Sequence, residues 1–174
     1  MSAGGIAKVQ QVILGLGSNI EPRLHLGKAV VLLRRQFTDF VLSPIYETCA
    51  VGFSGPNFWN LVAGVHTDLT LEELKAALRA IELTVGRPPQ AQKWADRCID
   101  IDILIYGNCR GASVVGHLPR ADILRHAYVL APLADVYPDL CHLETGRSFA
   151  QHWRDFAGDK TGICGRFAHE LLFA

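Results

Sequence analysis

The amino-acid sequence predicts an α+β fold of the ferredoxin-like type, a split βαβ arrangement with helices packed on one face of an antiparallel sheet. Four short apolar segments have the length of strands, and two longer segments carry apolar residues at helical spacing. Along the chain they occur in the order strand, helix, strand, strand, helix, strand. This order is the split βαβ unit repeated, which gives the predicted fold.

The first strand and the first helix are predicted between residues 12 and 37. Residues 12–16 form a short apolar run closed by Gly-Ser-Asn, which is typical of a buried strand that ends in a turn. Ser18 or Asn19 is expected to cap the helix that follows, and Pro22 suits its first turn. The helix is expected to bury one apolar face, formed by Leu24, Leu26, Val30, Leu33 and Phe37.

Two strands and a second helix are predicted next. Residues 40–46 and 60–67 have the composition of strands, and the loop between them, residues 47–59, contains glycine and several aromatic residues. Long loops of this kind are more often functional than short polar connections. The sequence Thr70-Leu71-Glu72-Glu73 matches a capping box, so we expect a helix over residues 71–85 that stops at Gly86.

The fourth strand is predicted over residues 99–106, after a segment of irregular composition. Beyond residue 118 three prolines interrupt the pattern, and residues 149–156 are predicted to form one more short helix. We expect one domain over residues 1–174, with its core in about residues 11–140 and a helical extension at the C-terminal end.

The overall composition restricts the classes of protein to consider. Seventeen basic residues balance 17 acidic ones, which argues against general binding to nucleic acid or to an anionic membrane. The five cysteines are odd in number and contain no C-x-x-C pair, so neither a disulfide framework nor a zinc site is expected. Neither a signal peptide nor a transmembrane run is recognisable. We expect a cytoplasmic protein that acts as a monomer or a weak dimer.

Two aspartates on the fourth strand are the strongest candidates for a metal site. Because side chains alternate along a strand, Asp100 and Asp102 point to one face together with Leu104, while Ile99, Ile101, Ile103 and Ile105 share the other. Two carboxylates on one face repel each other, and aspartate is a poor strand former, so the pair suggests an external cation. The alternative is an edge strand with a solvated outer face.

Nearby basic residues favour the metal over that alternative. Arg87, Lys93 and Arg97 lie within eleven residues of the sequence, just before the aspartates. Carboxylates beside a separate set of cations are what a complex of Mg²⁺ with a polyphosphate requires, since Mg²⁺ takes carboxylate and phosphate oxygens and arginine pairs with phosphate. Lys93 taken alone would fit a solvated loop equally well.

Gly15-Leu16-Gly17-Ser18-Asn19 also suggests a dinucleotide-binding turn, as in a dehydrogenase. Ile20 stands where the third glycine of G-x-G-x-x-G is required, so a tight turn into the helix is the better interpretation. The chain has no G-x-x-x-x-G-K-[ST] motif, which excludes a P-loop.

The segment Lys93-Trp94-Ala95-Asp96-Arg97-Cys98-Ile99-Asp100-Ile101-Asp102-Ile103 resembles the signature of the 6-hydroxymethyl-7,8-dihydropterin pyrophosphokinases, a family of folate biosynthesis. Further matching motifs occur in the right order, at residues 15–19, 47–48, 56–60, 81–83, 86–87 and 127–133. The resemblance spans roughly residues 11–140 and implies a ferredoxin-like fold, in agreement with the order of elements.

The resemblance implies a set of metal and ATP ligands. Asp100 and Asp102 would hold two Mg²⁺ ions that bridge the phosphates of ATP, and Arg87 and Arg97 would neutralise charge on the transferred group. The other ATP-binding residues would be Glu82, Lys93, Trp94, Ile103 and Arg120.

It also implies a pterin site and a reaction. The pterin ring would lie between Phe58 and Tyr128, and its polar edge would be read by Asn60 and by the backbone from Thr48 to Val51. The enzyme would transfer the diphosphoryl group of ATP to the pterin hydroxymethyl group, with positioning and charge stabilisation as its main contributions.

Some positions depart from the family pattern. Pro89 stands where many members have a second arginine, and Arg120 stands where histidine is common. These departures leave a second hypothesis open, a non-catalytic or slow relative that binds a pterin or a nucleotide.

Overall fold

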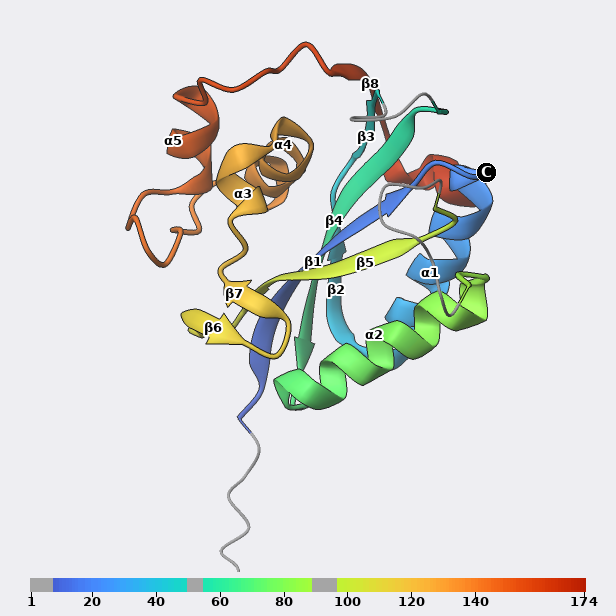
Figure 1. Ribbon diagram of the computed structural model, residues 1–174, viewed down its shortest axis with the longest axis horizontal. Helices are drawn as coiled ribbons and strands as arrows, with labels where there is room; N and C mark the ends of the chain where they lie inside the picture. Colours follow the sequence, from blue (N-terminus) through green and yellow to red (C-terminus); the bar gives the residue numbers. More distant parts are fainter. Residues whose placement is uncertain (1–7, 50–54, 89–96) are drawn as a thin grey trace, which may run out of the picture.

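A computed structural model describes residues 8–49, 55–88 and 97–174 (Figure 1). Its centre is a six-stranded sheet whose main path runs β5-β1-β4-β3-β8, with β2 also paired to β4. All of the strand pairs in this sheet are antiparallel. The strands are β1 (Gln10–Ser18), β2 (Thr38–Leu42), β3 (Ile45–Thr48), β4 (Phe58–Thr67), β5 (Asp100–Tyr106) and β8 (Ile163–Phe167). The order of β5, β1, β4 and β3 is that of the ferredoxin-like fold, as the sequence predicts.

Helices cover both faces of the sheet (Figure 1). On one face lie α1 (Pro22–Gln36) and α2 (Leu71–Val85), together with the short helix η1 (His169–Phe173). On the other lie α3 (Asp122–Arg125), α4 (Ala127–Val136) and α5 (Phe149–Arg154). A small ribbon of β6 (Gly111–Ser113) and β7 (Gly116–Leu118) follows β5. The expectation of helices on a single face therefore describes only half of the sheet.

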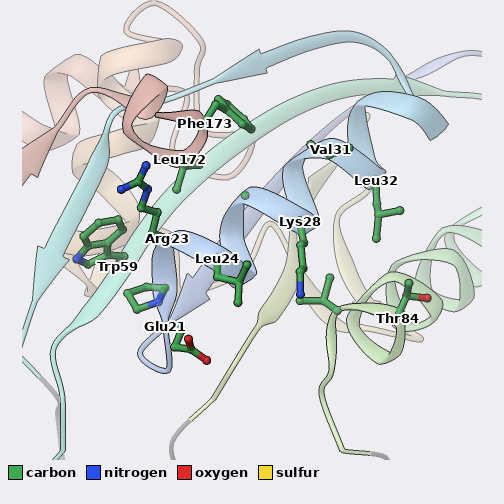
Figure 2. A pocket seen from close by; sticks show the side chains of 13 residues that line it. Glu21, Arg23, Leu24, Lys28, Val31, Leu32, Trp59, Thr84, Leu172 and Phe173 are labelled. Carbon is green, nitrogen blue, oxygen red and sulfur yellow. The ribbon is translucent and has the colours of Figure 1, made fainter.

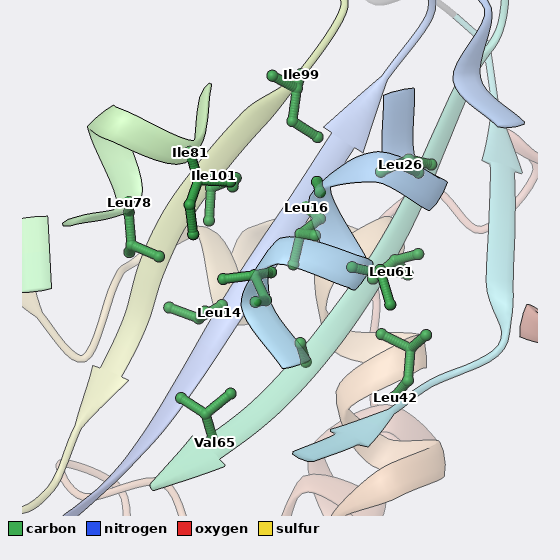
Figure 3. Packing of buried hydrophobic residues seen from close by; sticks show 14 of the residues in the cluster. Leu14, Leu16, Leu26, Leu42, Leu61, Val65, Leu78, Ile81, Ile99 and Ile101 are labelled. Carbon is green, nitrogen blue, oxygen red and sulfur yellow. The ribbon is translucent and has the colours of Figure 1, made fainter. Parts of the chain in front are cut away.

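The first core lies between the sheet and helices α1 and α2 (Figure 3). Val12, Leu14 and Leu16 of β1 point into it. The second core lies under α3, α4 and α5, and Ile13 of β1 and Val62 of β4 point into that one. A strand that is covered on both faces has an almost continuous apolar sequence, and this explains the unbroken apolar run of β1.

The capping box of α2 is confirmed. The Thr70 side chain accepts a hydrogen bond from the backbone N–H of Glu73, and the Glu73 carboxylate accepts one from the backbone N–H of Thr70. The helix ends at Gly86, whose φ of 125° is readily adopted only by glycine. The short helix predicted over residues 149–156 is found as α5.

The beginning of α1 differs from the prediction. Its N-cap residue is Glu21, which has a left-handed backbone and no side-chain capping bond. Asn19 instead accepts a hydrogen bond from the backbone N–H of Arg97 at 2.7 Å, and the Ser18 hydroxyl contacts the Ile20 and Arg97 carbonyls. The Gly-Ser-Asn turn therefore anchors the chain next to β5. Leu24, predicted to be buried, is 45% exposed.

The second predicted strand is interrupted, and the sheet therefore contains β2 and β3 as separate strands. At the break the backbone N–H of Ser43 donates to the Val62 carbonyl, and the Ser43 hydroxyl accepts from the Val62 N–H, both at 2.9 Å. Pro44 follows and has no N–H to continue the ladder. Hydrogen bonds of Ser43 thus replace one residue of regular strand pairing. The apolar periodicity of the sequence does not reveal this interruption.

Candidate active site

A cavity of about 220 Å³ opens on the face of the sheet that carries α3 and α4. Asp100 and Asp102 of β5 line it, and they lie opposite Gly17 and Gly15 of β1 in the sheet register. A side chain at Gly17 would come within 3.3 Å of the Asn60 amide oxygen, so glycine keeps this part of the cavity floor open. The prediction that both carboxylates share one face is confirmed.

The alternation along β5 fails at one later position. The register with β1 shifts between Ile13 and Leu14, so that Ile13 pairs with Ile105 and Leu14 pairs with Ile103. Leu104 is the extra residue of a β-bulge. Ile105 consequently turns to the second core, whereas Ile99, Ile101 and Ile103 point into the first core as predicted.

Asp100 is held by two arginines. Its carboxylate accepts a hydrogen bond from Arg87 Nη1 at 2.6 Å, and its second oxygen pairs with Arg97 Nη1. All three side chains are largely buried, so solvent screens these interactions only partly. The two arginines named from the sequence therefore meet at the first aspartate.

Glu82 lies behind this cluster, at the end of α2. Its carboxylate is 6% exposed and accepts hydrogen bonds from Arg87 Nη1 at 2.5 Å and from the backbone N–H of Ile101 at 2.8 Å. Its other oxygen pairs with Arg79 at 3.0 Å. Glu82 thus orients Arg87 and fixes the start of β5, and it is not among the residues that line the cavity.

Asp102 has a different electrostatic environment. Its nearest cation is Arg120, at 3.3 Å, and Arg120 also holds Asp122 through two hydrogen bonds of 2.9 and 2.7 Å. Burial, and next the negative charge of Asp100, raise the pKa of Asp102 to about 6. The two carboxylates are therefore not equivalent. Two arginines neutralise Asp100, whereas most of the free-energy penalty of burying the charge of Asp102 is not offset.

Aromatic side chains from two elements line the same cavity. Phe58 is the first residue of β4, and Tyr128 lies in the first turn of α4. The ring of His126 stacks on that of Tyr128 with centroids 5.0 Å apart. The Asn60 amide, also in the lining of this cavity, donates a hydrogen bond to the Thr48 hydroxyl at 2.9 Å. The cavity thus joins flat apolar surfaces to a polar edge.

Most of the residues named from the sequence meet at this cavity, which is lined by Thr48, Phe58, Asn60, Arg97, Asp100, Asp102 and Tyr128. Arg87 and Arg120 reach it through their ion pairs with the aspartates. The Ile103 side chain is buried in the first core, on the opposite face of β5, so only its backbone could meet a nucleotide. Val51, Lys93 and Trp94 lie outside the described residues.

The sequence reasoning missed several residues of the site. Asp122 and Val129 also line the cavity, and Arg79 completes the ion pairs of Glu82, whereas Cys49, another lining residue, falls within the backbone segment from Thr48 to Val51 that the resemblance implies. Asp122 had one available signal, because it stands two residues after Arg120. Nothing in the local sequence of Arg79 distinguishes it from a surface residue.

The carboxylates suit a magnesium ion that is shared with phosphate. Within residues 8–49, 55–88 and 97–174, no group of three or more His, Cys, Asp or Glu side chains could hold a metal. Mg²⁺ does not need such a group, because it is commonly bound by one or two carboxylates together with phosphate oxygens and water. Asp100 and Asp102 on one strand face fit that requirement.

Comparisons with known proteins point to one family. Residues 13–138 match the family described as 7,8-dihydro-6-hydroxymethylpterin-pyrophosphokinase (HPPK). The chain is 36% identical over 143 residues to 2-amino-4-hydroxy-6-hydroxymethyldihydropteridine pyrophosphokinase of Pseudomonas aeruginosa, covering 80% of this chain and 87% of the relative. It is 32% identical over 157 residues to the mitochondrial folate synthesis bifunctional protein of Pisum sativum.

The last match covers 88% of this chain but only 30% of the pea protein, so the chain spans less than a third of that relative. Among solved structures, Plasmodium falciparum HPPK-DHPS with pteroate superposes with a TM-score of 0.67 at 13% identity, over 86% of this chain and 44% of that one. This structural likeness supports the fold.

In the described part of the chain, no helix is both long and apolar enough to cross a membrane.

Proposed function

The chain belongs to the 7,8-dihydro-6-hydroxymethylpterin-pyrophosphokinase family, and we propose that it transfers the diphosphoryl group of ATP to 6-hydroxymethyl-7,8-dihydropterin. The pterin hydroxymethyl oxygen bonds to the β-phosphorus while the bond from that phosphorus to the oxygen bridging to the α-phosphorus breaks. AMP leaves, the hydroxyl proton is released, and the pterin diphosphate serves folate biosynthesis.

One observation carries the proposal, the meeting of a carboxylate and arginine cluster with two aromatic side chains in a single cavity. A polyphosphate needs the first group of residues and a flat heterocycle needs the second. Either group alone would fit many ligands, whereas both within about 220 Å³ suit a reaction between the two.

We assign the residue roles as the family resemblance implies, and the ion pairs of the two aspartates support them. Asp100 and Asp102 hold two Mg²⁺ ions, which when bound neutralise phosphate charge and draw electrons from the phosphorus under attack. Arg87 and Arg97 exchange part of their bonding to Asp100 for phosphate oxygens of the transferred group. Arg120 binds phosphate oxygens on the side of the cavity where Asp102 lies. Glu82 acts through Arg87 and β5.

The pterin occupies the aromatic side of the cavity. Phe58 and Tyr128 stack on its two faces, and Asn60 with the backbone of Thr48 reads its donors and acceptors. The hydrogen bond from Asn60 to Thr48 fixes the orientation of the amide before the pterin binds. Lys93 and Trp94, on the ATP side, and Val51, on the pterin side, complete the proposed set.

A second candidate is a binding protein that transfers slowly or not at all. It is favoured by Pro89, which takes the place of an arginine common in the family, and by the ion pairs that already occupy Arg87 and Arg97. An assay of AMP release with ATP, Mg²⁺ and the hydroxymethyl pterin distinguishes the candidates. The enzyme produces AMP only when the pterin is present, whereas binding of both ligands without AMP would establish the second candidate.

The sequence also supports proposals about the setting of the protein. We expect small molecules as its substrates, a cytoplasmic location, no nucleic acid or membrane as partner in the reaction, and a monomer or a weak dimer. Sedimentation at several protein concentrations tests the last point, and fractionation of cells that express the full chain tests the location.

A further inference from the structure

A second hollow lies on the other side of the molecule, over the outer surface of α1 (Figure 2). It encloses about 810 Å³. Helix α1 forms its floor, the last turn of α2 lies along one side, and Trp59 with Leu172 and Phe173 of η1 lies along the other. We call this hollow the α1 groove. It shares no lining residue with the candidate active site.

The α1 groove exposes large apolar side chains. Leu24, Val31 and Phe173 are 45%, 38% and 48% exposed, and all three line it. Ile20 and Leu83, which are also exposed, are the chain neighbours of two further lining residues. Three of the eight exposed large hydrophobic residues of the described chain therefore line this one groove, and such clustering marks interaction sites.

The surface along α1 is mostly positive, with Glu21 as the acidic residue among the described residues that line the groove. Helix α1 contains Arg23, Lys28, Arg34 and Arg35 and not one acidic residue, although the whole chain has no net charge. None of the four forms an ion pair with another described residue. Arg34 instead lies over the ring of Phe173, 5.5 Å from its centroid. The cations are therefore available to an external carboxylate.

Apolar and basic residues alternate along α1, from Leu24, Lys28 and Val31 in the lining of the groove to Arg35 beyond it. Leu24, Lys28, Val31 and Arg35 follow at intervals of four, three and four residues, which places them on one stripe of α1. A helix laid along this stripe would meet an apolar residue and a cation in turn. Complementary side chains on that helix would be apolar at helical spacing with Asp or Glu at the edges.

We propose that the α1 groove binds an acidic amphipathic helix of another protein. Its apolar face covers Leu24, Val31 and Phe173, and its carboxylates pair with Arg23, Lys28 and Arg35. A second copy of this chain fits poorly, because a two-fold contact would bring two α1 helices with four unpaired cations each together. An anionic membrane fits poorly too, because a nearly flat surface leaves a concave groove unfilled.

The test uses the full chain and a fluorescein-labelled model helix of about 18 residues, slightly longer than α1, with leucine at i, i+3, i+4 and i+7 and glutamate along both edges. Fluorescence anisotropy measures its binding to the wild type and to Lys28→Glu and Val31→Glu. Matched controls are Arg110→Glu and Val114→Glu, which alter an exposed cation and an exposed apolar residue elsewhere. A scrambled peptide and a lysine-edged peptide control for the sequence and the charge.

The expected result is binding of the acidic helix that weakens at least tenfold in each groove variant, is unchanged in both controls, and falls as salt rises. Melting temperature and pterin-dependent AMP release should stay near the wild-type values in all four variants, which separates this proposal from the proposed function. No binding of the acidic helix at about 100 µM, or equal binding of the scrambled peptide, overturns it.

Two other results also overturn the proposal. If vesicles of anionic phospholipid bind the wild type and Val31→Glu abolishes that binding while the peptide fails to bind, the α1 groove is a membrane surface. If sedimentation shows a wild-type dimer that Val31→Glu dissociates, the occupant is a second copy of the chain.

Discussion

Asp100 and Asp102 stand two residues apart on one strand, yet their surroundings differ. Arg87 and Arg97 neutralise Asp100, whereas Asp102 has one cation, Arg120, which it shares with Asp122. Repulsion between the two aspartates therefore destabilises mainly the charged form of Asp102. Neutralising Asp100 and neutralising Asp102 should therefore have different effects on the stability of the fold.

Asp102→Asn should stabilise the fold while nearly abolishing transfer. The pKa of Asp102 is about 6 in the folded protein against 3.8 for the free side chain, so ionisation of Asp102 reduces stability as pH rises from 3.8 to about 6. Asparagine does not ionise. The increase in melting temperature should thus be greatest above pH 6 and vanish below pH 4. Thermal unfolding between pH 4 and 8 measures it, and an equal increase at every pH would contradict the explanation.

Asp100→Asn should also abolish transfer but should lower stability. Replacing the carboxylate removes two charged hydrogen bonds and leaves Arg87 and Arg97 partly unpaired, for an expected loss of about 1 to 3 kcal/mol in the free energy of unfolding. Urea unfolding at pH 7 compares the two variants. Near-normal turnover of Asp102→Asn at limiting Mg²⁺ would favour a solvated edge strand over a metal site.

The aromatic residues of the cavity give a separate prediction. Phe58→Ala and Tyr128→Ala should each weaken pterin binding by about 1 to 3 kcal/mol, as for stacking of bases on aromatic side chains, and should hardly change ATP binding. Titration calorimetry measures both ligands. Trp59→Ala is the matched control, because Trp59 follows Phe58 on β4 but contacts Phe167 and lines the α1 groove. Unfolding of Phe58→Ala would instead identify Phe58 as a core residue.

At the scale of elements, the end of α2 and the start of β5 are joined through one carboxylate. Glu82 accepts from the backbone N–H of Ile101 and from Arg87, while Asn19 accepts from the backbone N–H of Arg97. These two contacts fix the strand on either side of Asp100. The end of β5 that carries Asp100 is therefore positioned by Glu82 of α2 and by Asn19 in the turn after β1, which belong to distant parts of the sequence.

Glu82→Ala should lower the free energy of unfolding by about 2 to 4 kcal/mol, because it leaves the buried backbone N–H of Ile101 without its acceptor and Arg87 with Asp100 as its remaining carboxylate partner. ATP affinity should fall with it, since Arg87 loses its orientation. Glu82→Gln keeps a carbonyl oxygen for Ile101 and should lose less of both. Glu72→Ala, at an exposed position of the same helix, serves as the control. Equal stability of the Ala and Gln variants would contradict this role.

At the scale of the whole molecule, the layer of α3, α4 and α5 must be held at a fixed position over the sheet, because Tyr128 belongs to that layer and Phe58 to the sheet. Asp135 near the end of α4 provides one connection. It accepts a hydrogen bond from the Tyr46 hydroxyl of β3 at 2.7 Å and pairs with Arg166 of β8 at 2.9 Å. Burial and Asp135 raise the pKa of Tyr46 to about 12, so this bond stays intact at neutral pH.

Asp135→Asn should weaken this connection without touching either substrate. We expect a loss of about 1 to 2 kcal/mol in the free energy of unfolding and a KM for the pterin that rises more than the KM for ATP, because only the pterin contacts both layers. Steady-state kinetics with each substrate varied in turn measures the difference. Asp139→Asn, on the loop after α4, should change neither constant. A uniform decrease in kcat with unchanged KM values would exclude the positioning role.

Features that depend only on residues close together in the chain could be predicted from the sequence. The capping box at Thr70, the shared face of Asp100 and Asp102, and the apolar face of α2 depend on residues at most a few turns apart, and chain geometry alone fixes them. Arg87 and Arg97 became candidates through their position just before the aspartates, whereas the pairing of Phe58 with Tyr128 and the role of Arg120 came only from the family resemblance.

Features that depend on contacts with distant residues are seen only in the three-dimensional structure. Ser43 divides a predicted strand because it meets Val62, Leu104 forms a bulge because of its register with β1, and Leu24 stays exposed because η1 and α2 leave a groove above it. In the same way, Asp100 and Asp102 have equivalent places in the sequence pattern but unequal charges around them. Periodicity encodes the direction of a side chain, whereas its burial and pairing depend on segments that only folding brings together.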